Sequence, residues 1–214
     1  MLPDWDLELW KEIERLPNIF FFLSSTTIEP RISPYPGILA PYDYGSTPET
    51  FREDILLKEY KSIKGNDWSG ATWPPNIVHK DLWDLIGGYR VEFFPGLYSD
   101  PDFSMKLYEA GVRHYLGVDA SRAYHFGSKT TIRTSLNFGH KQFLNKWGIT
   151  SASFTRLFLR RGMLYQGDIV VNPRNNAIRR AMLKSNLKRI FWLLGGTGKT
   201  KGKFSYNKKQ LNGK

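Results

Sequence analysis

The sequence contains no cysteine among its 214 residues, and no apolar run is long enough to cross a bilayer. Without cysteine the chain cannot form a disulfide or bind a metal through thiolates, which fits a cytoplasmic protein. The first residues, Met1–Asp6, are acidic and lack an apolar core, so we expect no signal peptide. Acidic residues are also scarce, but only in the second half.

The net charge of +11 is distributed unevenly along the chain. Residues 1–128 contain 12 Lys and Arg against 19 Asp and Glu, a net charge of −7. Residues 129–214 contain 19 Lys and Arg and a single acid, Asp168, a net charge of +18. A segment this basic favours a polyanionic partner, such as a phosphorylated substrate, an anionic membrane surface or nucleic acid.

Short apolar strands that alternate with helical patterns indicate an α/β chain. Proline and glycine predict a loop over residues 25–44, and a composition rich in glycine, lysine and asparagine predicts a disordered tail over residues 195–214. The expected helices cover residues 7–16, 48–63, 79–86, 102–110, 137–147, 151–161 and 175–194, and the expected strands cover residues 19–24, 69–73, 112–118 and 120–126.

One ordered set of residues carries the strongest functional signal. Gly87 and Gly88 close a predicted helix, an acidic turn with Asp100 and Asp102 opens the next helix, and His125 ends a predicted strand. Carboxylates act as general bases or metal ligands, and a neutral imidazole is a common metal ligand. A structural alternative stays open, in which Asp100 is an N-cap, Asp102 is a first-turn acid and His125 belongs to the core.

With these residues in this order, the segment from about Trp68 to Thr131 resembles the C-terminal half of a family-2 glycosyltransferase with the GT-A fold. In that family the acidic turn usually reads Glu-Asp-x-Asp-Leu, whereas here Ser99 replaces the first acid and Asp100 keeps the second. Together with a weaker match before Trp68, the resemblance covers about two thirds of the chain. It implies a partial GT-A-like mixed sheet flanked by helices, with a basic helical C-terminal extension.

The resemblance also implies roles for individual residues. Asp100 would be the catalytic base that deprotonates an acceptor hydroxyl, and His125 would coordinate a divalent cation, Mn or Mg, that screens the departing nucleoside diphosphate. The resemblance implies substrate contacts for eight further residues, and each of them also has a structural interpretation. The tryptophans could pack in the core, the glycines could end a helix, Asp102 could be a first-turn acid, and Lys129 and Arg133 could lie in an exposed basic loop. The residues implied to contact substrate are Trp68, Gly70, Trp73, Gly87, Gly88, Asp102, Lys129 and Arg133.

On this interpretation residues 1–134 form the C-terminal half of a GT-A domain and residues 135–194 form the basic helical extension. The nucleotide-binding half, with its Asp-x-Asp metal motif, has no counterpart in the sequence. We therefore expect an incomplete enzyme, whose other metal ligands lie upstream of Met1 or whose missing half comes from a partner chain.

The predicted function is inverting sugar transfer from a nucleotide-sugar to a glycan or lipid-linked acceptor. Residues 175–194 combine Arg and Lys with apolar residues and a tryptophan, which favours an anionic membrane surface at the inner face of the membrane, or a helix packed on the domain with solvated lysines. Two other functions stay open. A basic nucleic-acid-binding module would lack any recognisable binding motif, and a non-catalytic remnant would act with a partner chain.

Overall fold

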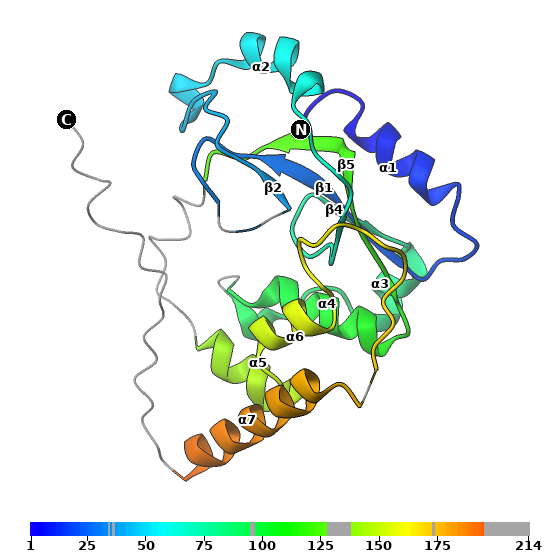
Figure 1. Cartoon of the computed structure of the whole chain (residues 1–214), viewed down its shortest axis with the longest axis vertical. Helices are drawn as coiled ribbons and strands as arrows, with labels where there is room; N and C mark the ends of the chain where they lie inside the picture. Colours follow the sequence, from blue (N-terminus) through cyan, green and yellow to red (C-terminus); the bar gives the residue numbers. More distant parts are fainter. Residues whose placement is uncertain (34, 36, 95–96, 128–137, 173, 195–214) are drawn as a thin grey trace, which may run out of the picture.

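The computed structural model describes residues 1–33, 35, 37–94, 97–127, 138–172 and 174–194 and has an α/β fold (Figure 1). A mixed sheet is flanked by helices, as the sequence predicts. In chain order the elements are α1 (Trp5–Ile13), β1 (Phe21–Ile28), β2 (Ile38–Leu39), η1 (Pro48–Thr50), α2 (Glu53–Glu59), η2 (Tyr60–Ser62), β3 (Trp68–Ser69), β4 (Asn76–Val78), α3 (Lys80–Ile86), η3 (Val91–Phe93), α4 (Ser99–Glu109), β5 (His114–Tyr124), α5 (Gly139–Trp147), α6 (Ser151–Leu157) and α7 (Asn176–Leu193).

Strand β1 is the centre of the sheet. It pairs in parallel with β5 and β2 and antiparallel with β4, while β3 pairs antiparallel with β5. The strand order is therefore β2-β1-β5-β3, with β4 on the same edge of β1 as β2. Because β1 and β5 are parallel, the residues that follow them, Glu29 and His125, reach the same edge of the sheet.

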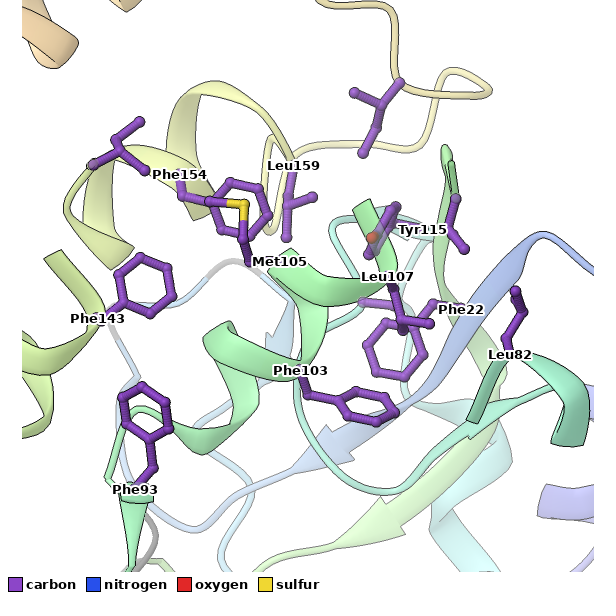
Figure 2. Close-up of a cluster of buried hydrophobic side chains, with 14 residues drawn as sticks. Phe22, Leu82, Phe93, Phe103, Met105, Leu107, Tyr115, Phe143, Phe154 and Leu159 are labelled. Carbon is purple, nitrogen blue, oxygen red and sulfur yellow. The ribbon is translucent and has the colours of Figure 1, made fainter. Parts of the chain in front are cut away.

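Helices cover both faces of this sheet. On one face, Phe22 and Tyr115 pack against Phe103 of α4, in a core that continues to Phe143 of α5 and Phe154 of α6 (Figure 2). On the other face, side chains of β1 and β5 pack against α1 in a smaller cluster (Figure 1). Alternating side chains along β1 thus supply two separate cores, as expected for a strand covered on both sides.

Strand β5 is a single element where the sequence predicts two strands, over residues 112–118 and 120–126. Ser25 pairs with Val118 but the next residue, Thr26, pairs with Arg122, so the segment between them bulges out of the ladder. The guanidinium of Arg122 stabilises this bulge by donating to the Asp119 carboxylate, at 2.7 Å, and to the Asp119 carbonyl, at 2.8 Å. The strand therefore continues across the predicted break, with a bulge that Arg122 bridges.

The ends of α3 and α4 position the candidate site. Helix α3 ends at Gly87 and Gly88, whose φ angles of +70° and +56° are left-handed, as the sequence predicts. Helix α4 differs from the expectation, because its N-cap is Tyr98 at φ +73° and not Asp100. Asp100 therefore lies inside the first turn of α4.

None of the helices in the described residues is long and apolar enough to cross a membrane.

Candidate functional site

Asp100 is the least satisfied acid of the predicted site. Its side chain is partly buried, and within the described ranges its carboxylate makes no hydrogen bond or ion pair. Burial raises the pKa of Asp100 to about 6. A carboxylate that titrates near neutral pH and has no competing donor is suited to accept a proton from a hydroxyl group.

Buried polar atoms gather near Asp100. Burial raises the pKa of Tyr89, a hydrogen bond with the Asn76 side chain opposes this rise, and the charge of Asp100 adds to it. The three side chains are therefore neighbours. The Ser24 Oγ atom, on the β1 residue opposite Asn76 of β4, is buried without a hydrogen-bond partner among the described residues. An unpaired buried hydroxyl of this kind costs stability in the sheet beside Asp100.

The Gly87–Gly88 turn holds Tyr89 in place. The Lys106 ammonium of α4 donates to the Gly88 carbonyl, which ties the end of α3 to α4. Tyr89 then stacks on Phe103, with ring centroids 4.5 Å apart. A Cβ at Gly87 would meet no atom within 4 Å, so the outer side of the turn is open within the described structure. The two glycines and Lys106 together fix the position of the Tyr89 hydroxyl near Asp100.

Asp102 is held by other protein side chains. It is 1% exposed, and its Oδ1 atom accepts from Lys146 Nζ at 2.8 Å and from Trp147 Nε1 at 2.7 Å. Lys146 also contacts Glu92 at 2.9 Å. These contacts join α4 to α5 and favour the structural interpretation of Asp102 over a contact with substrate.

Trp68 and Gly70 lie in a tightly packed part of the structure. Trp68 is 3% exposed, its indole N–H donates to Thr26 Oγ1 at 3.0 Å, and a Cβ at Gly117 would lie 1.9 Å from it. Gly70, at φ +83°, approaches the backbone of Arg161: a Cβ added at Gly70 would lie 2.6 Å from the Arg161 Cα atom. Trp68 also lines a cavity of about 250 Å³, with Thr26, Gly37, Leu39, Lys64, Gly65, Asn66, Asp67, Gly162 and Leu164.

Trp73 belongs to an aromatic cluster with a cation. Its ring lies 5.2 Å from that of Tyr35, and the Arg161 guanidinium lies 4.7 Å from the centre of Trp73 and 5.3 Å from that of Tyr35. Arg161 forms no ion pair with a carboxylate of the described chain. Burial and, to a lesser extent, Tyr35 raise the pKa of Tyr98, so the cluster extends to the N-cap of the helix that carries Asp100.

His125 pairs with a residue that the sequence analysis did not identify. Its Nδ1 atom lies 2.7 Å from Glu29 Oε1, and the two residues follow β5 and β1 at the same sheet edge. A carboxylate on one ring nitrogen commonly orients an imidazole that binds metal through the other. The pair therefore fits one imidazole ligand of an Mn or Mg site, but in the parts of the chain described no three His, Asp or Glu residues gather as a metal site would require.

The structure thus brings together only part of the predicted site. Asp100 meets Tyr89, which directly follows the Gly87–Gly88 turn, and Asn76, which the sequence analysis missed, and Trp73 meets Arg161. Nothing in the sequence distinguishes Glu29, Asn76 or Arg161 from other polar residues, and Glu29 falls inside the predicted loop over residues 25–44. Lys129 and Arg133 lie outside the described residues.

Comparisons with known protein families, with curated proteins and with solved structures find no match. The functional assignment therefore depends on the chemistry of the site itself and on the resemblance of its motifs.

Proposed function

We propose that the chain is the acceptor-side part of an inverting glycosyltransferase, with Asp100 as the general base. The observation that carries the proposal is the Asp100 carboxylate, which is partly buried, has no partner in the described structure and has a pKa raised to about 6. An acid in this state is ionised at neutral pH, when it can still accept a proton, which a base in sugar transfer must do.

In the proposed reaction an acceptor hydroxyl binds beside Asp100 and Tyr89. Its oxygen attacks the anomeric carbon of the donor sugar, the bond from that carbon to the diphosphate oxygen breaks, and Asp100 takes the hydroxyl proton. The nucleoside diphosphate departs with the bonding electrons, and the configuration at the anomeric carbon inverts. Asn76, which neighbours Tyr89 and Asp100, would bind a sugar hydroxyl through its side-chain amide.

The other groups have supporting roles in this proposal. The faces of Trp73 and Tyr35 suit the C–H face of a sugar, and the Arg161 cation beside them suits a phosphate oxygen. His125, oriented by Glu29, would supply one ligand to Mn or Mg, which stabilises negative charge on the leaving diphosphate when bound. The glycan or lipid-linked acceptor and the donor sugar are proposed as classes only.

The test is transfer of a labelled sugar from a panel of nucleotide-sugars to glycan and lipid-linked acceptors, with Mn or Mg. The protein should be purified from its native host, so that any accompanying chain is retained. Asp100→Asn should lower the transfer rate by about 10²- to 10⁴-fold, because it removes the base with little change in volume. Asp84→Asn makes the same chemical change at an exposed surface ion pair and should leave the rate unchanged.

Unchanged turnover in Asp100→Asn would contradict the role of Asp100. Full activity in the presence of a chelator would remove His125 from the proposal. If transfer is absent and the protein instead binds arbitrary DNA in a salt-dependent manner, the nucleic-acid-binding function would be favoured.

A further inference from the structure

Helix α7 is apolar on two opposite sides. On one side Ile178 and Trp192, with the small polar Ser185 midway between them at a spacing of seven residues, are buried against the domain, where α7 packs on α5 and α6 (Figure 1). Apolar residues at positions i, i+4, i+7 and i+11 form a second row on the opposite side. We call this row the outward stripe; it consists of Leu183, Leu187, Ile190 and Leu194.

The outward stripe is exposed to an unusual degree. Its four side chains are between 53% and 82% exposed, and the adjacent Phe191 is 52% exposed. Among the described residues, no other element covers this side of the helix, and in Figure 1 α7 forms the layer farthest from the sheet. A contiguous apolar surface of this kind marks an interaction site, whereas single exposed apolar side chains need no explanation.

Basic side chains lie alongside the outward stripe. Arg180, Lys184 and Lys188, at a spacing of four residues, run along one flank, and Arg179 lies at the beginning of the stripe. No acidic residue occurs between Asn175 and Leu194, and none of these four cations forms an ion pair within the described chain. The face is therefore apolar in the middle and positively charged beside it; of the four cations, Lys188 also contacts the Trp192 ring, 4.6 Å from its centroid.

Charge and apolarity together select one kind of occupant. A second copy of the chain would place the same cations against each other, which is unfavourable. Nucleic acid would neutralise the cations but leave the apolar row exposed to water. An anionic bilayer surface satisfies both, because apolar side chains insert at the level of the acyl chains while long basic side chains extend to the phosphates.

We propose that α7 binds an anionic lipid surface through the outward stripe and the adjacent Arg and Lys residues. The helix lies parallel to the membrane and keeps its packing on α5 and α6. Trp192, which from the sequence alone would be placed in the membrane, stays in the domain: it is 9% exposed and packs against His140, with ring centroids 5.6 Å apart. This arrangement does not depend on the proposed glycosyltransferase activity.

The test is cosedimentation of the full chain with vesicles of phosphatidylcholine alone or mixed with phosphatidylglycerol. We expect binding only to the mixed vesicles, and weaker binding at higher salt, because the surface charges become screened. Replacing the outward stripe (Leu183→Gln, Leu187→Gln and Ile190→Gln) should weaken binding by more than about tenfold, because apolar side chains no longer insert. The matched control replaces exposed apolar residues elsewhere, Leu57→Gln, Leu85→Gln and Val91→Gln, and should bind like the unmodified protein.

A second set of variants tests the charges. Arg180→Gln, Lys184→Gln and Lys188→Gln together should weaken binding to the mixed vesicles by about a hundredfold. Neutralising three lysines far from α7, Lys11→Gln, Lys58→Gln and Lys61→Gln, changes the net charge equally and should have a much smaller effect. Circular dichroism checks that every variant keeps its helices.

A label gives a direct reading of insertion, because the chain has no cysteine of its own. A polarity-sensitive dye on Leu187→Cys should shift to shorter wavelength when mixed vesicles are added, and the same dye on Leu85→Cys should not. The proposal would be overturned by equal binding to vesicles without phosphatidylglycerol, by no loss of binding in the stripe variant, or by a dye at position 187 that stays in water. It would also be overturned by a stable dimer that dissociates when the stripe is replaced, since a second copy would then cover this face.

Discussion

Replacing Asp102 by alanine tests whether this acid has a structural role. The Asp102 Oδ1 atom accepts from the Lys146 ammonium at 2.8 Å and from the Trp147 indole at 2.7 Å, and the side chain is 1% exposed. Asp102→Ala removes both acceptor contacts at once and leaves the indole N–H without a partner in a part-buried position. We therefore expect the variant to fold but to be clearly less stable.

The expected loss follows from the two contacts. Breaking a buried ion pair by removing one partner costs about 3–5 kcal/mol, and an unpaired buried donor costs about 1–3 kcal/mol. Lys146 remains partly exposed and keeps Glu92 as a partner at 2.9 Å, so its share is at the low end. A destabilisation of about 3 kcal/mol results, which for a chain of this length lowers Tm by roughly 6–12 °C.

Urea unfolding followed by tryptophan fluorescence measures this loss, since the chain has seven tryptophans. Asp84→Ala is the matched control, because Asp84 is an exposed acid whose only ion pair in the described residues, with Lys80, lies on the surface. The control should change the free energy of unfolding by less than about 1 kcal/mol. Asp102→Asn, which keeps an acceptor oxygen but not the charge, should give about half the loss of Asp102→Ala.

A double-mutant cycle with Trp147→Phe isolates the contact to the indole. The double variant should be more stable than the sum of the single losses predicts, by about 0.5–3 kcal/mol. The reasoning would be refuted if Asp102→Ala unfolded within about 0.5 kcal/mol of the unmodified protein. It would also be refuted if the cycle gave no coupling, because the buried contacts would then contribute nothing.

Three further predictions concern other parts of the molecule. Because burial raises the pKa of Asp100 to about 6, above its value in the unfolded chain, ionising it opposes folding, and stability is lost as pH rises from about 4 to about 6. Asp100→Asn should therefore be more stable than the unmodified protein by about 3 kcal/mol at pH 8, with a difference that disappears near pH 4 in urea titrations. Gly117→Ala should destabilise by about 1–3 kcal/mol and alter the near-ultraviolet circular dichroism, since its Cβ would lie 1.9 Å from Trp68; an unchanged spectrum would contradict this packing. Thr150→Ala should cost about 1 kcal/mol in urea unfolding, because the Thr150 hydroxyl caps α6 by accepting from the Ser153 N–H at 3.2 Å, and Thr150→Ser should recover most of the loss.

Local signals in the sequence predict much of the fold. The end of α3 follows from Gly87 and Gly88, which adopt left-handed conformations at little steric cost. The first half of β1 follows from its apolar run, but its last residues, Ser25 to Ile28, lie in the segment that its prolines and glycine predict to be a loop. They stay in the sheet because β5 and β2 pair with their backbone, and this pairing is invisible in the local sequence.

The candidate site is only partly predictable for the same reason. Asp100 stands out because an acid in the first turn of a helix has both a structural and a chemical interpretation. Asn76 and Tyr89 become relevant only when β4 and the end of α3 bring them beside Asp100. Arg161 reaches Trp73 through contacts between distant segments of the chain. The amphipathic reading of α7 has a similar limit, because the sequence does not say which of its two apolar sides packs on the domain.

The pairing of β1 with β5 has a consequence for synthesis of the protein. Phe21 of β1 lies opposite His114 of β5, so the central strand has to wait for its main partner while about 90 further residues are translated. At about 5–20 residues per second, this interval is roughly 5–20 s. During it a strand that is almost entirely buried in the finished protein is without its main partner on the ribosome. The nascent chain is therefore most vulnerable to aggregation before β5 emerges, and slower growth or added chaperone during expression should raise the soluble yield more than any change to the buffer of the purified protein.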